Sequence, residues 1–347
     1  MWRIKISNTV FITGSAGFIG FHLAQTFLSK NWKVVGFDAM TNYYDVNLKK
    51  HRHSILKKNP SFLAYKGLLQ DPKLLNEVYE RHKPNIIIHL AAQAGVRYSI
   101  DNPISYVESN LIGTFHILEL ARKHKPEHLL MASTSSVYGS NIDMPLHENQ
   151  KSDTPMSFYA ATKKSNEAMA HSYSHLYHIP ITMLRFFTVY GPWGRPDMAL
   201  FKFTRNMLSG QPIDVYNNGN MVRDFTYVSD LVNAIYLLTD KIPLLPRNRD
   251  KQIKHDNISD VAPFRVVNIG NSKPTNLLDF IVELEKVLAI NAKKNYLGMQ
   301  DGDIHKTHSD ISLLENLIGS QIKTTVNEGI TRFVVWYQSY YEQKFVS

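Results

Sequence analysis

The chain has 347 residues, of which 39 are lysine or arginine and 30 are aspartate or glutamate, giving a formal net charge of +9, and it contains no cysteine. A hydrophobic share of 44% is enough for a packed core and excludes a wholly disordered chain. The lack of cysteine excludes disulfides, cysteine-ligated iron–sulfur clusters and catalysis by a thiol.

The positive charge is spread along the chain. Basic residues occur in short pairs such as Lys49-Lys50 and Lys57-Lys58, and no block of five or more like charges is present. This scatter disfavours a nucleic-acid partner. No apolar run approaches the roughly 18 residues of a membrane helix, and the first one, residues 9–13, ends at Gly14. We therefore expect a soluble, cytoplasmic protein that binds neither nucleic acid nor a membrane.

Short apolar runs alternate with segments of helical periodicity along most of the chain. The apolar runs predict strands at residues 10–13, 32–38, 86–90, 128–132, 181–186 and 265–269. The helical pattern predicts helices up to residue 28 and at residues 74–81, 104–123, 159–177, 200–208, 227–239, 275–288, 310–317 and 326–341. A polar, basic stretch at 247–260 predicts an exposed loop. Apolar strands alternating with helices are typical of a parallel sheet covered on both faces.

Three glycines lie where the first predicted strand turns into a helix, in the pattern Gly14-x-x-Gly17-x-x-Gly20. Glycines there permit a tight turn, let backbone N–H groups approach a pyrophosphate, and allow close packing of helix on strand. Asp38 ends the second predicted strand, where a carboxylate binds the adenosine ribose diol and repels a 2′-phosphate. The pattern predicts NAD rather than NADP, and an α/β fold with a Rossmann-type doubly wound parallel sheet and a smaller mixed α/β carboxy-terminal substrate lobe.

Tyr159 and Lys163 are four residues apart, so a helix presents both on one side. A free phenol has a pKa near 10, and a nearby ammonium together with an oxidised nicotinamide ring lowers it. The resulting phenolate can take a proton from a hydroxyl group as hydride leaves the same carbon. We interpret the pair as a candidate catalytic base with its supporting cation.

The glycine spacing and the Tyr-x-x-x-Lys pair resemble the extended short-chain dehydrogenase/reductase family over nearly the whole chain. Residues 89–93, His-Leu-Ala-Ala-Gln, match the segment of that family that lines the cofactor, and Asn110 matches a largely structural asparagine. Leu68 stands where family members usually carry an aspartate that reads the adenine amine, which implies apolar and backbone contacts to the adenine instead. The resemblance implies NAD bound by Gly14, Gly17, Phe18, Ile19, Gly20, Asp38, Leu90, Ala91, Ala92 and Lys163.

A hydroxyl-rich segment, residues 132–139, follows the fourth predicted strand. In the family this loop completes the active site, and Thr134 matches the residue whose hydroxyl bridges the tyrosine and a substrate oxygen. Dehydratases and decarboxylating members of the family carry acidic residues beside it, whereas this chain has Ser135 and Ser136. The resemblance thus disfavours elimination and implies epimerisation catalysed by Tyr159, Lys163 and Thr134, with bound NAD reduced and reoxidised in one cycle.

Three separate stretches, residues 42–49, 93–99 and 186–199, resemble the UDP-glucuronate 4-epimerases. The resemblance implies conversion of UDP-glucuronate to UDP-galacturonate through a 4-keto sugar, an activity that commonly supplies polysaccharide biosynthesis. No metal is expected. The implied substrate contacts are Arg97, Ser135, Ser136, Thr188, Arg195, Arg223 and Asp303, with Arg195 and Arg223 matching phosphate contacts and Asp303 a ribose contact.

Thr188 has a further implied role. A 4-keto uronate is a β-keto acid, which readily loses carbon dioxide, so an epimerase must hold the carboxylate in an unreactive orientation. By resemblance, Thr188, Ser135 and Ser136 could supply these hydrogen bonds.

Several alternatives remain open at this stage. The substrate could be a UDP-N-acetylhexosamine or UDP-galactose, the product could be a decarboxylated UDP-pentose, or the chain could be a non-catalytic scaffold that binds NAD or a nucleotide sugar. The family implies a homodimer formed by the helices at 104–123 and 159–177. It also implies an NAD-binding Rossmann domain of residues 1–187 and 225–269, and a UDP-sugar-binding lobe of residues 188–224 and 270–347.

Overall fold

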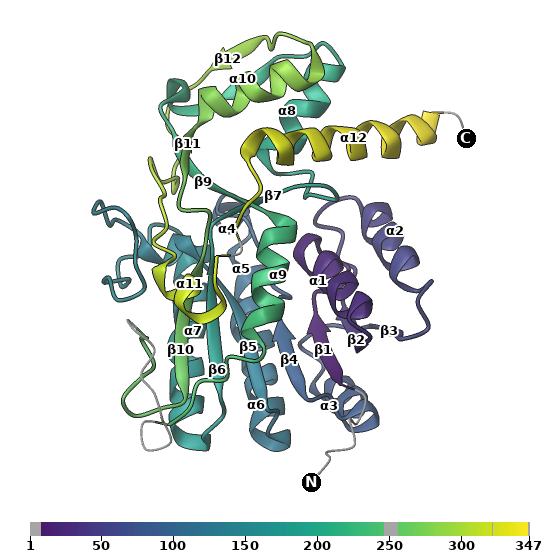
Figure 1. The fold of residues 1–347 in the computed structure, drawn as a ribbon, viewed down its shortest axis with the longest axis vertical. Helices are drawn as coiled ribbons and strands as arrows, with labels where there is room; N and C mark the ends of the chain where they lie inside the picture. Colours follow the sequence, from purple (N-terminus) through teal and green to yellow (C-terminus); the bar gives the residue numbers. More distant parts are fainter. Residues whose placement is uncertain (1–7, 246–255, 321, 346–347) are drawn as a thin grey trace.

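Seven parallel strands form the centre of the protein, in the order β10-β6-β5-β4-β1-β2-β3 (Figure 1). The computed structural model describes residues 8–245, 256–320 and 322–345. The strands are β1 (Thr9–Thr13), β2 (Lys33–Asp38), β3 (Phe62–Lys66), β4 (Ile86–His89), β5 (His128–Thr134), β6 (Ile181–Phe186) and β10 (Phe264–Ile269). The predicted doubly wound parallel sheet is confirmed, and β3 is the strand that the apolar pattern did not predict, because only its first residue is buried.

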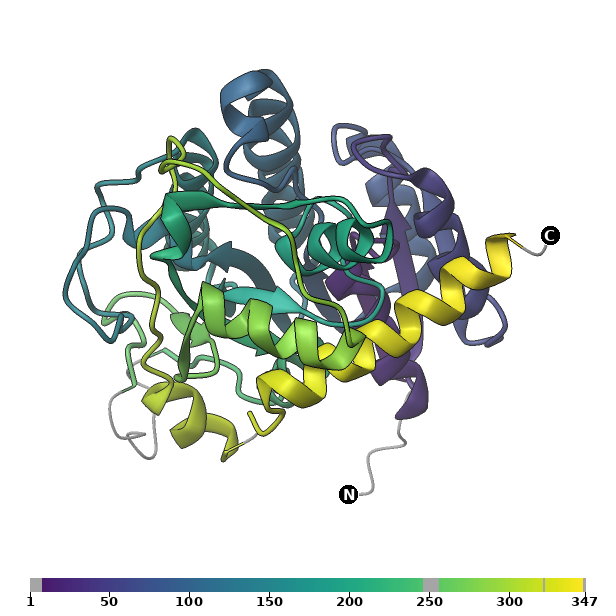
Figure 2. The ribbon, with the colours of Figure 1, turned by 90° about the horizontal axis from the view of Figure 1, so that it is seen from above.

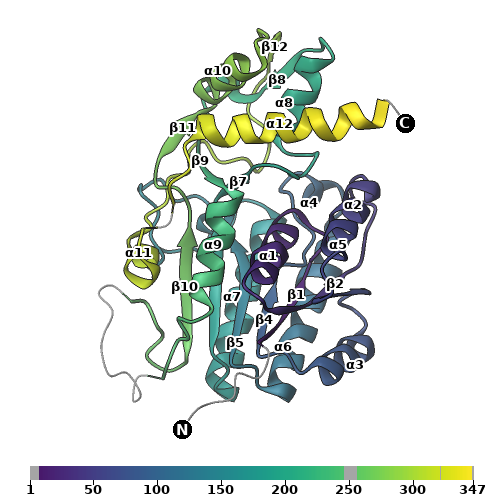
Figure 3. The same ribbon diagram turned by 45° about the vertical axis from the view of Figure 1, so that its right-hand side comes forward.

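Helices cover both faces of this sheet. Successive residues of a strand point to opposite faces, so Val10 and Ile12 of β1 lie in one apolar core and Phe11 lies in the other. The first core includes side chains of α1 (Phe18–Ser29), α2 (Val46–Leu56), α9 (Val228–Leu238) and α11 (Ser312–Ile318). The second includes side chains of α3 (Pro72–His82), α6 (Gly113–His124) and α7 (Phe158–Tyr177). Figure 3 shows α1 and α9 on the near side of the sheet.

The single helix predicted at 104–123 is wrong in detail, because the structure divides this stretch. α4 (Tyr98–Asp101) and α5 (Pro103–Tyr106) precede a π-helical turn, Val107–Ile112, which continues into α6. Asn110 lies in that turn. Its side chain accepts a hydrogen bond from Gln93 N at 2.8 Å and donates to Thr162 Oγ1 at 3.1 Å. The turn therefore links the segment after β4 to α7.

A smaller lobe lies above the carboxyl edge of the large sheet. β7 (Thr188–Tyr190), β9 (Val222–Tyr227) and β11 (Pro274–Asn276) form a three-stranded sheet, and β8 (Ile213–Val215) pairs with β12 (Lys294–Tyr296). The lobe also contains α8 (Ala199–Leu208), α10 (Leu277–Leu288) and α12 (Val326–Phe345). A third core of aromatic and aliphatic side chains, among them Phe201, Phe225, Phe280 and Phe333, holds these elements together. Figure 2 shows α12 running from this lobe across the molecule toward α2.

The division into two domains stays a prediction. It is supported by the separate third core, but α11, which the prediction gave to the lobe, packs into the core of the large sheet. β9 also crosses the predicted boundary at residues 224 and 225. Most of the predicted loop at 247–260 lies outside the described residues, which resume at Asp256.

The parallel register brings the carboxyl ends of several strands to one edge. Thr13 of β1 lies beside His89 of β4, and Thr134 of β5 lies beside Phe186 of β6. Ligands of open parallel sheets bind outside this edge. Within the described part of the chain, no helix is long and apolar enough to cross a membrane, and no cluster of His, Asp or Glu side chains could hold a metal ion.

Candidate active site

The stretch of residues 14–20, from the end of β1 into α1, leaves no room for a side chain at its glycines. Gly14 has a φ of +76°, and a Cβ there would lie 2.8 Å from Ala91 N. A Cβ on Gly20 would lie 2.0 Å from Gly14 O. The first N–H groups of a helix have no partner within it, so those of Phe18 and Ile19 at the start of α1 are suited to an anion. The loop thus has the form that a dinucleotide pyrophosphate requires.

Asp38, at the end of β2, is fixed beside this loop. Its Oδ2 accepts a hydrogen bond from Ala16 N at 2.9 Å, and its Oδ1 accepts one from Met40 N at 2.8 Å. A carboxylate has about four acceptor positions, so two remain for a ribose diol. Leu68 is 53% exposed at the neighbouring end of β3, which is compatible with the apolar adenine contact that the sequence predicts.

The segment Leu90-Ala91-Ala92 extends from β4 along the same edge. Ala91 N donates to Thr13 Oγ1 at 3.2 Å, and Thr13 Oγ1 lies 2.8 Å from His89 Nδ1. Burial lowers the pKa of His89 to about 3, so this imidazole is neutral. It fixes Thr13 and, through Thr13, the backbone at Ala91.

Tyr159 and Lys163 lie in the first two turns of α7. Ser157 caps this helix by accepting a hydrogen bond from Ala160 N at 3.1 Å. Lys163 is buried, and its Nζ donates to the carbonyl of Ala132 at 3.0 Å. Burial lowers the pKa of Lys163 to about 8. Since α7 crosses the end of β5, both side chains reach the strand edge.

The electrostatic surroundings of Tyr159 differ from those expected. Loss of contact with water raises its pKa, and the groups that oppose this rise are the Arg195 guanidinium and the Thr134 hydroxyl. The Lys163 ammonium donates to Ala132 O instead of to the phenol. That Lys163 lowers the pKa of Tyr159 stays a prediction. The positive nicotinamide ring, the other predicted cause, belongs to the cofactor.

Thr134 ends β5 and begins the hydroxyl loop. Its Oγ1 accepts a hydrogen bond from Ser136 N at 3.2 Å and donates to Ser136 Oγ at 3.2 Å. Ser135 follows it in a short 3-10 helix that runs to Tyr138. This places Thr134 and Ser136 side by side on the same edge of the sheet as Tyr159.

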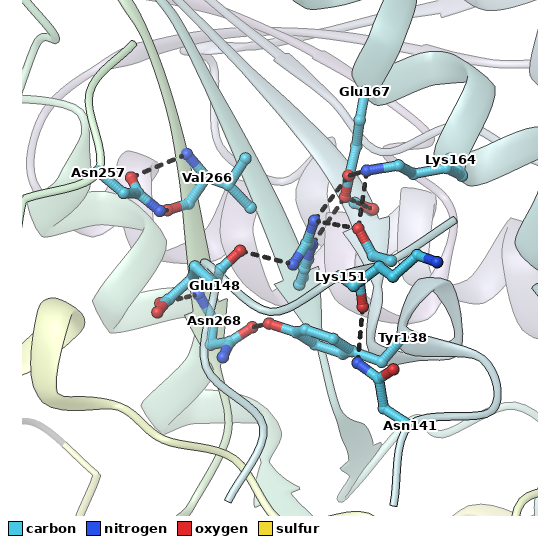
Figure 4. A network of polar contacts seen from close by, with 12 residues as sticks. Tyr138, Asn141, Glu148, Lys151, Lys164, Glu167, Asn257, Val266 and Asn268 are labelled. Carbon is cyan, nitrogen blue, oxygen red and sulfur yellow. Dashed lines mark hydrogen bonds and ion pairs between the residues drawn. The ribbon is translucent and has the colours of Figure 1, made fainter. Parts of the chain in front are cut away.

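A buried polar network supports this loop (Figure 4). Ser133 Oγ donates to Glu167 Oε1 at 2.6 Å, and Arg185 binds both carboxylate oxygens of Glu167, at 2.9 and 2.8 Å. The hydroxyl of Tyr138 donates to Asn268 Oδ1 at 2.7 Å. Both ends of the loop are thereby fixed to neighbouring strands and to α7. No sequence motif indicated these residues, because the contacts join positions that lie from 18 to 130 residues apart.

Arg195 faces the tyrosine from the lobe side. It forms an ion pair with Asp197, whose carboxylate also accepts a hydrogen bond from the Tyr43 hydroxyl at 3.2 Å. Thr188 and Arg195 line one small cavity together with Phe18 of the glycine-rich loop. Three further tyrosines, which the sequence analysis did not identify, form a tyrosine wall beside Tyr159. Tyr43 and Tyr98 have ring centres 4.7 Å apart, and the ring centre of Tyr106 lies 6.0 Å from that of Tyr159.

A second group of predicted residues comes together away from this cavity. Arg97 and Asp303 approach within 3.5 Å, and the Arg97 guanidinium lies 4.6 Å from the centre of the Tyr216 ring. Burial lowers the pKa of Arg223, while Asp303 opposes the decrease. The pKa of Lys202 is lowered mainly by burial and also by the nearby positive charge of Arg97. Tyr216 and Lys202 were not predicted as site residues.

This geometry, a phenol beside a dinucleotide loop and a hydroxyl loop, is that of an enzyme acting on an alcohol carbon with a nicotinamide cofactor. Residues 10–252 match the NAD dependent epimerase/dehydratase family. The chain is 51% identical over 333 residues to the probable UDP-glucuronate 4-epimerase of Rhizobium meliloti (strain 1021), covering 96% of this chain and 97% of that protein. The chain therefore belongs to this NAD-dependent family, which confirms the resemblance seen in the sequence.

Two further comparisons agree with this membership. UDP-glucuronate 4-epimerase 1 of Arabidopsis thaliana is 42% identical over 338 residues, covering 96% of this chain and 77% of the plant protein. The crystal structure of UDP-glucuronic acid 4-epimerase from Bacillus cereus in complex with UDP-glucuronic acid and NAD superposes with a TM-score of 0.86 at 31% identity, covering 96% of this chain and all of that one.

Glu148, in the network behind the hydroxyl loop, generates a prediction about stability. Its Oε1 accepts a hydrogen bond from Asn268 N at 2.8 Å, and burial raises its pKa to about 7 from 4.5; Arg185 opposes this rise and Asp310 adds to it. Between pH 4.5 and 7 the folded protein binds a proton that the unfolded chain does not, so stability falls as the pH rises through this window.

We predict that Glu148→Gln removes this pH dependence. The amide of the variant cannot ionise, so its free energy of unfolding relative to the wild type should increase by up to about 3 kcal/mol from pH 5 to pH 8. Urea denaturation across that range measures the difference, with Glu77→Gln on the exposed side of α3 as the matched control. Parallel curves for Glu148→Gln and the wild type would contradict the role assigned to this carboxyl.

Proposed function

We propose that the chain is a UDP-glucuronate 4-epimerase, which interconverts UDP-glucuronate and UDP-galacturonate with NAD as its resident cofactor. One observation carries the proposal: the Arg195 guanidinium and the Thr134 hydroxyl both favour the ionised form of the buried Tyr159 phenol, at the edge of the sheet where the glycine-rich loop lies. The relatives with this name match nearly the whole chain, including the lobe. That match supports the uronate over the neutral UDP-sugars.

Bound NAD would supply reversible hydride chemistry at the sugar C4. The Tyr159 phenol oxygen takes the proton of the C4 hydroxyl and later gives it back. The Thr134 hydroxyl, held beside Ser136, fixes the C4 oxygen against Tyr159. Lys163 would hold the nicotinamide ribose. Epimerisation results if the keto sugar turns over between the two transfers, so no external oxidant is consumed.

The pKa of Tyr159 would depend on the charges of the bound cofactor and substrate. Burial raises its pKa in the protein alone, and Arg195 and Thr134 offset part of this rise. A cationic ring and an ordered substrate would lower it further. Tyr159 would then remove a proton efficiently only when cofactor and substrate are both bound.

The cations divide between the two ends of the substrate. Arg195 lies toward Tyr159, so we assign it to the sugar rather than to the diphosphate that the sequence motif suggested. Arg97, Arg223 and Asp303 form the other cluster, with Tyr216, and we assign them to the nucleotide and diphosphate. A guanidinium fork suits paired phosphate oxygens.

Catalysis is tested first by substrate choice. The wild type should convert UDP-glucuronate with at least about tenfold higher kcat/KM than UDP-glucose or UDP-N-acetylglucosamine, as measured by chromatography of the products. Tyr159→Phe should lower kcat by about 10²- to 10⁴-fold, because it removes the general base. Tyr177→Phe, on the same helix, is the matched control and should leave kcat unchanged. Preference for a neutral sugar would contradict the proposed substrate.

We assign Thr188 to the restraint of the substrate carboxylate. Oxidation at C4 creates a ketone β to that carboxylate, and the C5–C6 bond breaks when it aligns with the ketone π system, releasing carbon dioxide and leaving its electron pair on C5 to be protonated. Thr188 lines the same cavity as Arg195. We propose that its hydroxyl holds the carboxylate out of this alignment.

Thr188→Val keeps the shape of the side chain and removes the hydroxyl. We expect UDP-pentose and carbon dioxide to appear beside UDP-galacturonate, with a several-fold higher KM for UDP-glucuronate. Thr331→Val, at an exposed position of α12, is the control. Retention of the wild-type KM without any pentose product would show that Thr188 does not contact the carboxylate.

The proposal extends to a homodimer in the cytoplasm that supplies polysaccharide synthesis. Apolar side chains of α4 to α7 face solvent in the single chain, including Ile104, which is 60% exposed, and Leu176, which is also 60% exposed. Ile100, Ile112, Phe115 and Phe158 are exposed on the same helices. Pairing across a twofold axis would bury these side chains.

Light scattering after size-exclusion chromatography tests the dimer. The wild type should have twice the mass of one chain, and Ile104→Asp should shift it toward the monomer by placing a charge in the interface. Ile142→Asp is the control, since Ile142 is 87% exposed on a loop outside these helices. A monomeric wild type, or a dimeric Ile104→Asp variant, would contradict this arrangement.

A further inference from the structure

Arg52, on α2, is fully buried, yet no carboxylate forms an ion pair with it among the described residues. Its Nη1 donates to Ala16 O at 2.9 Å and to the Tyr44 hydroxyl at 2.8 Å. Its Nη2 donates to Trp193 O at 2.5 Å and to Gly194 O at 3.4 Å. Its Nε has no partner in the structure. A buried guanidinium held only by neutral oxygens is an incompletely compensated charge.

The two sets of acceptors belong to two different parts of the molecule. Ala16 is in the glycine-rich loop, and its own N–H donates to Asp38. Trp193 and Gly194 belong to the turn that leads from β7 to Arg195. One guanidinium fork thus joins the cofactor loop to the turn that carries the cation facing Tyr159.

The turn is held in a conformation that its own sequence disfavours. Trp193 has a φ of +60°, a region that a bulky residue rarely adopts and that persists only where the surroundings impose it. The Trp193 ring packs against Phe21 of α1 at 5.5 Å between ring centres, and against Trp336 and Tyr340 of α12 at 5.2 and 5.1 Å. The carbonyl of the preceding residue, Pro192, accepts a hydrogen bond from His22 Nε2 at 2.8 Å. Burial lowers the pKa of His22 to about 4, so it is neutral.

We propose that Arg52 is a positioning residue that couples binding of the NAD pyrophosphate to the placement of the Trp193–Arg195 turn. A dianionic pyrophosphate on the loop compensates the charge of Arg52 and strengthens its bonds to the loop and the turn together. Coupling of this kind is reciprocal, so an ordered turn also favours retention of the cofactor. The link to sugar binding, through Arg195, rests on the function proposed above, whereas the link from NAD to the turn does not.

Arg52→Lys and Arg52→Gln separate charge from geometry. Lysine keeps the positive charge, but a single ammonium cannot serve acceptors on both sides as the guanidinium fork does. Glutamine removes the charge as well. We expect Arg52→Lys to retain NAD within about threefold of the wild-type affinity and Arg52→Gln to lose it by about tenfold or more. Arg81→Gln, at an exposed position of α3, loses the same charge without contact to the loop and is the control.

The decisive readout is hydrogen exchange of the peptide that contains residues 191–195, followed by mass spectrometry with and without NAD. In the wild type and in Arg81→Gln, NAD should slow this exchange at least about fivefold; in Arg52→Lys the slowing should fall below about twofold even at saturating NAD. Equal protection in Arg52→Lys and the wild type would overturn the proposal, as would an absence of protection in the wild type. Exchange in α7 reports whether a variant is folded.

Calorimetry supplies the second arm. NAD should raise the affinity of the wild type for UDP-glucuronate about tenfold, within the usual range of such couplings, and this gain should be lost in Arg52→Lys. Retention of the gain in Arg52→Lys would overturn the coupling to the sugar site. A wild type that binds no UDP-glucuronate would instead contradict the proposed function, while the exchange experiment would still decide the role of Arg52.

Discussion

The close approach of Gly14 to the backbone of Ala91 is the contact on which the rest of the site depends. A Cβ at Gly14 would lie 2.8 Å from Ala91 N, so the loop can adopt its turn only without a side chain. The same peptide of Ala91 is fixed by Thr13, which in turn contacts the neutral His89. The glycine-rich loop and the end of β4 therefore form one rigid surface, and the hydroxyl loop and α7 are built against the next strand along the edge.

Two sets of polar contacts, one behind the hydroxyl loop and one on the lobe side, position the groups that surround Tyr159. The network of Glu167, Arg185 and Ser133 holds the hydroxyl loop from behind, so Thr134 meets Tyr159 in a fixed position. On the lobe side, Arg195 approaches the same tyrosine from a turn held by Arg52. The two sets of contacts lie far apart in sequence, yet both act on the Tyr159 phenol. Burial raises the pKa of this phenol, and Arg195 and Thr134 oppose the rise. Placement of a base between two separately supported elements is a form of preorganisation.

The sequence was informative where the chemistry is local. The spacing of Gly14, Gly17 and Gly20 and the pair Tyr159 and Lys163 depend on one turn or one helix, so their placement could be predicted. The parallel sheet followed from apolar runs buried on both faces. β3 was not predicted because only its first residue, Phe62, is buried. The break before α6 was not predicted because apolar periodicity does not distinguish a π-helical turn from an α-helix.

Features that depend on tertiary contacts could not be predicted in this way. The direction of Lys163 toward Ala132, the position of Arg195 beside Tyr159, and the tyrosine wall all join segments from different strands. Arg52 is the clearest case: it lies in a helix with several other basic residues, and no sequence pattern shows that it is completely buried. Its function could be inferred only after the glycine-rich loop and the turn at Trp193 were seen on either side of it.

The central claim is that one hydride leaves C4 of UDP-glucuronate and returns to the same carbon within the site. Proton NMR of an incubation with UDP-glucuronate deuterated at C4, with no added oxidant, tests it most directly. The account predicts that UDP-galacturonate grows to equilibrium with the deuterium still at C4. An unchanged spectrum with NAD present, or a product that has lost the deuterium to water, would contradict it.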